Sequence, residues 1–386
     1  MAQAREADTY VVDCDAHVLE PPDLWERYLE NKYKDRAIKI VTEEDGRESL
    51  VIDNGPHALT GRLAVLGGVL LERSKLWTPE TEYVKYLDGA PRPSMYGPDR
   101  LKLFDASGID AGIVAPTIGL VWETDDVGLG NAYARAYNTW LYEEFAAADP
   151  KRLLAVAHLH LKDVDTALKE LRLRIKQGFR GVFIGSERVL GKGFAHPDFD
   201  PIWRELEDSG LPVIMHIVVH RRDRGLSWIS EWYDEGQVPA AYTFGLGAIM
   251  QIVPAVTTMI LDGLFDRFPK LKVLCIEAGA GWAPYLMHRL DTKYHHFDFT
   301  APLELGKPSE YFHRNLWFSA EPEERTINNL MDVVGEERIL WGSDYPHIDS
   351  HTESPNQIRE SVAGLSKHRQ GLVLGKNART LLLLDR

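Results

Sequence analysis

The chain has 386 residues, of which 44% are hydrophobic, 10% aromatic and 26% charged, and this composition is typical of a folded protein and excludes global disorder. Its formal net charge of -14 repels the phosphates of nucleic acids and anionic lipid surfaces, and the sequence has no compensating basic patch. These features predict a protein that binds neither nucleic acid nor membrane and that acts on small molecules.

Eight short apolar runs predict eight buried strands, most of them separated by helical patterns such as residues 131–148, 164–177 and 201–209. The runs are residues 10–15, 111–117, 153–159, 181–185, 212–216, 272–277, 316–320 and 338–344. Alternating strands and helices are the pattern of parallel βα units, and eight strands close a barrel. We therefore predict an α/β fold, a (β/α)8 TIM barrel in which residues 1–386 form a single domain.

Two long excursions interrupt this rhythm. Residues 31–97 contain two short alternating runs around the turn Glu44-Asp45-Gly46, which predicts an insertion that carries a β-hairpin after strand 1. It is expected to emerge from the catalytic face. Residues 219–242 carry charges, Trp228 and Trp232, and are expected to form a second lid element over the same face.

The cysteines and the N-terminus concern the cellular compartment. Cys14 and Cys275 are the only cysteines, and each lies inside a predicted buried strand, which indicates reduced thiols rather than a disulfide scaffold. Residues 1–8 are polar and lack the apolar core of a signal peptide, and we find no apolar stretch of about 18 residues. A cytoplasmic location is expected.

Metal-binding residue types stand at the ends of three predicted strands. Asp15 and His17 end the first strand at positions i and i+2, so their side chains point to the same side. His216 ends the fifth strand and Asp344 the eighth, and in a TIM barrel these ends meet at the catalytic face. A single strand-end Asp or His is more often a turn, surface or core residue. Together, two carboxylates and two imidazoles are a suitable set for one divalent ion with an open position.

Six segments carry a family resemblance in the family's order along the chain. They are residues 13–21 (with Asp15-Ala16-His17), 178–182, 211–216, 268–272, 281–284 and 342–347 (Gly-Ser-Asp-Tyr-Pro-His). With them the chain resembles the amidohydrolase-related (amidohydrolase 2) family of the amidohydrolase superfamily, in the branch that includes aminocarboxymuconate-semialdehyde decarboxylase. The resemblance implies that Asp15, His17, His216 and Asp344 are metal ligands, that Asp344 also accepts a proton, and that the protein is a homodimer.

The sequence departs from that family at two points. Many relatives carry His-x-His, Glu-x-Ala or Glu-x-His where this chain has Asp15-Ala16-His17. The second carboxylate weakens the Lewis acidity of the site and favours harder ions, so zinc is the first expectation and manganese the second. The characterised decarboxylases of the branch tend to end strand six with a histidine that assists proton transfer, whereas this chain has Glu277.

Two carboxylates have alternative interpretations. Glu277 is a candidate general acid or base, because a carboxylate beside apolar walls can have a raised pKa. It is equally compatible with a structural role in which it hydrogen-bonds the Gly-rich loop that follows. Glu20 either orients a metal ligand or opens a turn before Pro21 as a solvated carboxylate.

Five further residues are expected near the site. His220 and His347 lie in loops after strands five and eight and are candidate substrate contacts, with a purely structural role in their loops as the alternative. Trp282 is a third candidate for the substrate pocket, with packing as its alternative. His158 and His160 flank the end of strand three on one face, and the sequence does not decide which of them lies near the metal.

Three functions compete at this stage. The first is hydrolysis by a metal-activated water, with Asp344 taking its proton and Glu277 protonating the leaving group. The alternative is non-oxidative decarboxylation of a small aromatic or unsaturated carboxylate at the same site. The third is a barrel without catalysis, but a scaffold has no physical need for converging carboxylates at its strand ends.

Overall fold

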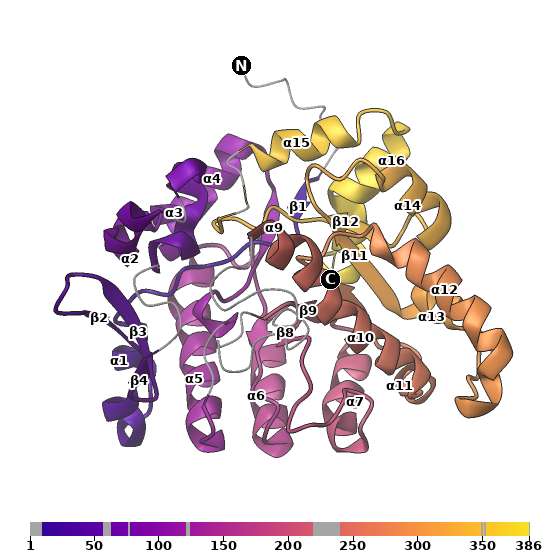
Figure 1. The fold of residues 1–386 in the computed structure, drawn as a ribbon, viewed down its shortest axis with the longest axis horizontal. Coiled ribbons are helices and arrows are strands. Elements are labelled where there is room, and N and C mark those ends of the chain that lie inside the picture. The colour runs from indigo at the N-terminus through magenta and orange to yellow at the C-terminus, as the bar shows by residue number, and fades with distance from the viewer. Residues whose placement is uncertain are drawn as a thin grey trace.

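The computed structural model describes residues 10–56, 63–75, 78–120, 124–218, 240–348, 350 and 353–385. A closed parallel β-barrel forms its centre, with helices around it (Figure 1). The barrel strands are β1 (Val12–Asp13), β5 (Ala111–Val114), β6 (Leu153–Ala155), β7 (Ala157–His158), β8 (Val182–Gly185), β9 (Val213–His216), β10 (Val273–Cys275), β11 (Leu316–Ala320) and β12 (Ile339–Trp341).

The strands pair in the order of a (β/α)8 barrel. One ladder runs β1-β5-β6 and the other β12-β11-β10-β9-β8-β7. Strands β6 and β7 are two halves of one barrel strand interrupted at Val156, because β6 pairs with β5 and β7 with β8. The Cys14 N–H donates to the Trp341 carbonyl at 3.0 Å and joins β1 to β12, which closes the barrel. The predicted TIM barrel is confirmed, with each of its eight predicted strands in place.

The barrel strands are buried on both faces, which explains their continuous apolar runs. Every residue of β5, β9 and β11 is buried, because side chains that point inward fill the barrel and those that point outward contact helices. The helix pattern follows the same rule. On α7, Ile202, Trp203 and Leu206 face inward at helical spacing and are fully buried.

Helices occupy every crossover between barrel strands, and α5, α6 and α7 lie side by side in Figure 1. The sixteen described α-helices are α1 (Leu24–Tyr28), α2 (Tyr86–Gly89), α3 (Arg92–Met95), α4 (Gly97–Ser107), α5 (Val127–Trp140), α6 (Val164–Lys176), α7 (Asp200–Ser209), α9 (Ala240–Tyr242), α10 (Ala248–Leu261), α11 (Leu264–Arg267), α12 (Trp282–Phe297), α13 (Pro308–Asn315), α14 (Ile327–Val334), α15 (Ser354–Ser361), α16 (Lys367–Gly371) and α17 (Asn377–Leu381). Asp126 and Asp163 cap α5 and α6 by accepting from the N–H groups of Leu129 and Thr166.

The hairpin predicted within residues 31–97 is present. Strands β2 (Lys39–Thr42) and β3 (Glu48–Ile52) pair antiparallel, and β4 (Gly55–Pro56) extends the sheet. Arg36 connects this sheet to α5. Its Nε donates to Asp53 at 2.6 Å, and its Nη1 donates at 2.7 Å to Asp126, which caps α5. The hairpin projects beside α1 and α5 at the left edge of Figure 1.

One sequence-based expectation about apolar stretches is wrong. Residues Thr243–Leu261, which comprise a π-helical turn and α10, form a helix whose most apolar 18-residue window has a mean hydropathy of 1.8. By length and composition alone this helix could cross a membrane. A helix packed on a core passes the same test, and 39% of that window is buried in the fold. Its apolar character therefore carries no membrane assignment.

The burial of Trp203 on α7 leads to a testable prediction about stability. Trp203 is 0% exposed and its indole N–H donates to the Phe194 carbonyl at 2.8 Å. Trp203→Ala is expected to lower the free energy of unfolding by about 3–5 kcal/mol, because it leaves a cavity and an unpaired carbonyl. Urea unfolding followed by tryptophan-independent circular dichroism measures this loss. Leu173→Ala, at a position 43% exposed on α6, is the control and is expected to change it by less than about 0.5 kcal/mol.

Candidate metal centre

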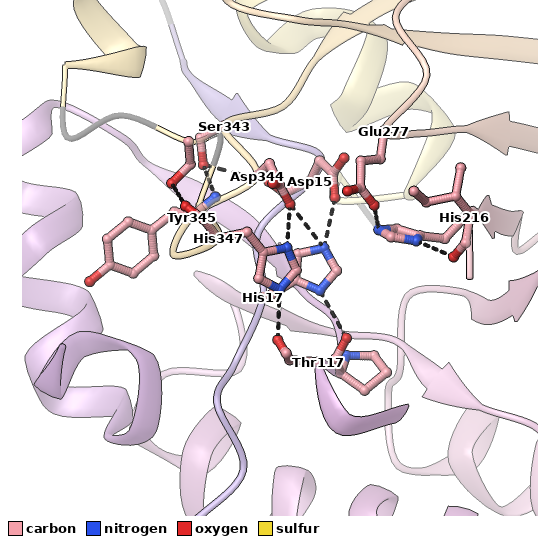
Figure 2. A network of polar contacts seen from close by, with 12 residues as sticks. Asp15, His17, Thr117, His216, Glu277, Ser343, Asp344, Tyr345 and His347 are labelled. Atoms are coloured by element: carbon pink, nitrogen blue, oxygen red, sulfur yellow. Dashed lines mark hydrogen bonds and ion pairs between the residues drawn. The ribbon is translucent and has the colours of Figure 1, made fainter. Parts of the chain in front are cut away.

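The predicted metal ligands converge at one end of the barrel. Ligand atoms of Asp15, His17 and His216 all lie within 4.8 Å of one another, and Asp344 Oδ1 lies 3.5 Å from His17 Nε2. These side chains come from the ends of β1, β9 and β12 and point toward one another (Figure 2). Both imidazoles are 0% exposed and Asp15 is 3% exposed. The structure thus brings together the four residues that the sequence singled out.

Residues 14–17, which follow β1, and residues 342–345, which follow β12, are joined by backbone hydrogen bonds. We call this pairing the seam, and it positions two of the proposed ligands. The His17 N–H donates to the Tyr345 carbonyl and the Asp344 N–H to the Asp15 carbonyl, both at 2.7 Å. Asp344 has a φ of 54°, a left-handed conformation that non-glycine residues rarely adopt, and Glu277 at the end of β10 has a φ of 53°. These turns follow directly on buried strands and carry both carboxylates at the mouth of the barrel.

Asp13 stabilises the seam by accepting hydrogen bonds from both of its sides. Its carboxylate accepts hydrogen bonds from the Ser343 N–H at 3.0 Å, the Ser343 hydroxyl at 2.6 Å and the Asp15 N–H at 3.2 Å. Burial raises the pKa of Asp13 to about 6, against the lowering effect of these hydrogen bonds. The sequence analysis did not assign a role to Asp13 or Ser343. For Asp13 the available signal was its charge inside the apolar run of strand one.

The hydrogen bonds of His17 define its tautomer. Nδ1 lies 2.9 Å from the Pro116 carbonyl, which can only accept, so Nδ1 carries the proton. Burial, and then the neighbouring His216, hold the pKa of His17 well below its usual value. Nε2 therefore presents a lone pair, and it faces Asp15 Oδ1 at 3.1 Å and Asp344 Oδ1 at 3.5 Å.

This donor set fits a divalent cation. A neutral imidazole nitrogen and two carboxylate oxygens are all electron-pair donors, and a cation between them would satisfy all three. His216 shares one feature with His17, since its Nδ1 donates to the Ile217 carbonyl at 2.6 Å, but its Nε2 lies 2.6 Å from Glu277 Oε2. Metal-binding histidines usually donate their other ring N–H to a carbonyl or carboxylate, which fixes the orientation of the ring.

Glu277 reaches the centre through His216. Its Oε2 lies 2.6 Å from His216 Nε2, and its side chain is 12% exposed. Burial lowers the pKa of His216, but the attraction of Glu277 outweighs it and raises that pKa to about 9. The alternative role considered for Glu277 was a hydrogen bond to the Gly-rich loop that follows it. In the structure Glu324 makes such a bond, because it accepts from the Ala280 N–H in that loop at 3.1 Å.

His347, a predicted substrate contact, contacts Asp344 and Thr117, and its ligand atom lies within 4.8 Å of those of His17 and Asp344. Its Nδ1 lies 2.7 Å from Asp344 Oδ1, its Nε2 lies 2.9 Å from the Thr117 hydroxyl, and its ring centroid is 4.2 Å from that of His17. Both ring nitrogens are thus engaged by protein groups, and the imidazole orients Asp344 (Figure 2). Thr117, which the sequence analysis did not single out, is the last residue of the predicted second strand (residues 111–117) but has no metal-binding group that would have marked it.

Glu20 organises the loop that carries these contacts. It is 0% exposed, so a solvated carboxylate at a turn is the wrong interpretation. Its carboxylate accepts from the N–H groups of Thr117 at 3.1 Å and Ile118 at 2.9 Å, and more weakly from Gly119 at 3.4 Å. Burial raises the pKa of Glu20 to about 7 despite these hydrogen bonds. Glu20 thereby fixes the loop after β5, whose Pro116 carbonyl accepts from His17 Nδ1.

Two further candidates, Trp282 and His158, contact aromatic side chains. Trp282 is 9% exposed, donates its indole N–H to the Gly279 carbonyl at 3.0 Å and packs edge-on against Phe318, so packing, the alternative stated for it, describes its contacts. His220 and most of the lid expected at residues 219–242 lie outside the described residues. His158 is buried behind Phe183, whose ring lies 5.1 Å from that of His216.

A cavity of about 310 Å³ opens above the ligands. Asp15, Glu277 and Asp344 line its floor, and α10 contributes an apolar wall with Ala248 and the preceding Phe244. The last two residues of β11 and the chain that follows them form another wall that the sequence analysis missed: Ser319, Ala320, Glu321, Pro322 and Glu323. The signal for it was the position of these residues at a barrel strand end. Among the described residues of the hairpin insertion, none lines this cavity.

The family model for amidohydrolases (Amidohydro_2) matches residues 12–384. The chain belongs to the amidohydrolase family. It is 29% identical to a 2-amino-3-carboxymuconate-6-semialdehyde decarboxylase of Dictyostelium discoideum, over 63% of this chain and 64% of that protein. It is also 29% identical to a gamma-resorcylate decarboxylase of Rhizobium sp. (strain MTP-10005), over 74% of this chain and 86% of that protein.

Solved structures share the fold over nearly the whole chain. An amidohydrolase from Mycobacterium avium subsp. paratuberculosis K-10 has a TM-score of 0.81 at 24% identity, covering 97% of this chain and 99% of that one. A 5-carboxyvanillate decarboxylase from Novosphingobium aromaticivorans, solved with bound manganese, has a TM-score of 0.67 at 19% identity, covering 98% of both chains.

These comparisons confirm the family resemblance and support an enzyme that is a metal-dependent hydrolase or carboxy-lyase. Ligand atoms of the described residues lie close enough together to hold a metal ion, and two of the solved neighbours hold manganese; zinc stays a prediction. Their named substrates are small molecules, as expected for this chain. The homodimer, the lack of nucleic-acid and membrane partners, and the cytoplasmic location remain predictions.

The seam yields a prediction at Gly342. A Cβ atom there would lie 2.2 Å from Asp15 Cβ and 3.0 Å from the Asp15 nitrogen, so Gly342→Ala is expected to displace Asp15. We expect a loss of about 1–3 kcal/mol in unfolding free energy and about tenfold weaker metal binding, measured by calorimetric titration. Gly193→Ala is the control, since nothing lies within 4 Å of its Cβ position. Equal metal affinity in the two variants would contradict the predicted role of the seam.

Proposed function

We propose that this enzyme is a metal-dependent decarboxylase of small aromatic or unsaturated carboxylates. The observation that carries the proposal is the neutral His17 Nε2 facing Asp15 and Asp344 beneath a cavity of about 310 Å³. The named relatives that match most of this chain are decarboxylases. Hydrolysis, the first interpretation of the sequence, becomes the second candidate.

Asp15, His17, His216 and Asp344 are the residues that would hold the ion. When bound, a divalent ion supplies a Lewis acid that binds substrate oxygens and stabilises negative charge. Two carboxylates among four ligands favour a hard ion, so manganese is proposed ahead of zinc. The neighbours solved with manganese support this order.

The cavity suits a substrate the size of a single ring. Its volume lies at the small end of the range for ligand pockets, about 300–1,000 Å³. The apolar side chains of Phe244, Ala248 and Ile217 line it above a polar floor. A planar aromatic ring with one carboxylate would place its apolar face on this wall and its oxygens on the floor.

Proton transfer falls to the carboxylates on that floor. In decarboxylation the bond to the carboxylate carbon breaks, its electron pair stays on the ring carbon, and that carbon takes up a proton as CO₂ leaves. We assign the proton to Asp344, whose Oδ1 is held at 2.7 Å by His347 Nδ1 and whose side chain lines the cavity. Glu277, whose Oε2 lies 2.6 Å from His216 Nε2, would stand beside the bound ion.

Glu277 is also the observation that keeps hydrolysis as a second candidate. It lines the cavity and stands where the characterised decarboxylases of the branch tend to have a histidine. A carboxylic acid at this place is suited to protonate a leaving group, which hydrolysis requires.

The product distinguishes the two reactions. Enzyme loaded with Mn²⁺ is incubated with 2,6-dihydroxybenzoate and other hydroxybenzoates, and in parallel with lactones and amides, in ¹⁸O-labelled water. Decarboxylation releases CO₂ and puts no labelled oxygen in the aromatic product, whereas hydrolysis puts one labelled atom in its product. Turnover of the lactones or amides, with no turnover of any hydroxybenzoate, would contradict the decarboxylase proposal.

Variants test the assignment of the centre. His216→Ala and Asp344→Asn are expected to reduce turnover at least about a thousandfold while far-UV circular dichroism and cooperative unfolding stay intact. His288→Ala, at an exposed position on α12, is the control and is expected to retain full activity. Wild-type protein that binds less than about 0.1 equivalent of Mn²⁺ or Zn²⁺ after reconstitution would rule out the metal centre itself.

A further inference from the structure

Arg100 on α4 is a buried arginine that touches the seam below the metal centre. It is 0% exposed. Its Nη2 donates to the His17 carbonyl at 2.5 Å and its Nε to the Pro93 carbonyl at 2.8 Å. Its Cζ lies 4.7 Å from the centroid of the Tyr345 ring. One side chain therefore contacts the backbone of one proposed ligand and the residue next to another.

The electrostatic setting of Arg100 is unusual. Burial lowers its pKa to about 10, and although Asp13 attracts it, no ion-pair contact joins the two among the described residues. A second buried arginine, Arg174, is different, because its Nε lies 2.6 Å from the carboxylate of Glu170. A buried guanidinium without a close carboxylate is costly, so its specific contacts have to account for its presence.

Through the seam, the contacts of Arg100 are connected to the residues that carry His17 and Asp344. The His17 N–H donates to the Tyr345 carbonyl, and Arg100 holds the carbonyl of His17 and the ring of Tyr345. Asp344 lies directly before Tyr345, and its N–H donates to the Asp15 carbonyl. A shift of Arg100 is thereby transmitted to His17 and to the turn that carries Asp344.

We propose that Arg100 is a positioning residue of the metal centre, which holds the β1 and β12 extensions at the separation that His17 and Asp344 need to share one ion. The guanidinium is suited to this role because its planar fork binds two carbonyls while its face stacks on an aromatic ring. This inference rests on the metal centre assigned under the proposed function, but not on which reaction the centre catalyses.

The test compares the two buried arginines. Arg100→Met and Arg174→Met each replace a buried guanidinium by an apolar chain, and the dissociation constant for Mn²⁺ is measured by competition with a chelator. Thermal unfolding of the metal-free proteins is measured in parallel. We expect both variants to unfold at lower temperature, and only Arg100→Met to weaken Mn²⁺ binding, by about 10- to 100-fold. Arg174→Met is expected to stay within about threefold of the wild type.

Arg100→Lys keeps the charge and removes the fork. Weaker Mn²⁺ binding than the wild type is expected for it too, because an ammonium cannot bind both carbonyls and stack on Tyr345. This variant carries the test if Arg100→Met fails to fold.

Wild-type affinity in both Arg100 variants, with a loss of thermal stability like that of Arg174→Met, would overturn the positioning role. Wild-type protein that binds no Mn²⁺ would overturn the metal centre and this role together. A wild type that binds Mn²⁺ and releases no CO₂ contradicts the decarboxylase proposal alone, and the comparison of affinities then still decides the role of Arg100.

Discussion

The metal centre depends on the seam where the first barrel strand meets the last. Asp15 and His17 leave β1 on one side of this seam, Asp344 leaves β12 on the other, and reciprocal backbone hydrogen bonds of 2.7 Å join the two extensions. The approach is so close that position 342 has no room for a Cβ atom. Three of the four proposed ligands therefore take their positions from a pairing between residues more than 320 positions apart in the chain.

A second layer of polar contacts determines which atoms face the centre. Backbone carbonyls of Pro116 and Ile217 bind the Nδ1 atoms of His17 and His216, so each Nε2 points inward. Glu20 in turn fixes the loop that presents the Pro116 carbonyl. Electron-pair donors gathered in a buried space repel one another unless a cation lies between them, and this electrostatic demand connects the fold to the chemistry.

The walls of the cavity carry carboxylates in addition to those of the proposed ligands. Glu277 follows β10, and its Oε2 lies 2.6 Å from His216 Nε2. The segment after β11 adds Glu321 and Glu323 to the lining. An additional carboxylate beside the centre adds a group that can give or take a proton there.

The sequence by itself determined the barrel and the convergence of the four proposed ligands, because both follow from local rules. Strand side chains alternate, and parallel strands in a barrel end on one face, so Asp15, His17, His216 and Asp344 could be assigned without knowledge of any distance. Only the tertiary structure decided the tasks of the surrounding residues. His347 turned out to hold Asp344, Trp282 to pack in the core, and Arg100 to bind the His17 carbonyl. A side chain's partner depends on which distant backbone atoms lie within hydrogen-bond distance of about 3 Å, and no periodicity in the sequence encodes that.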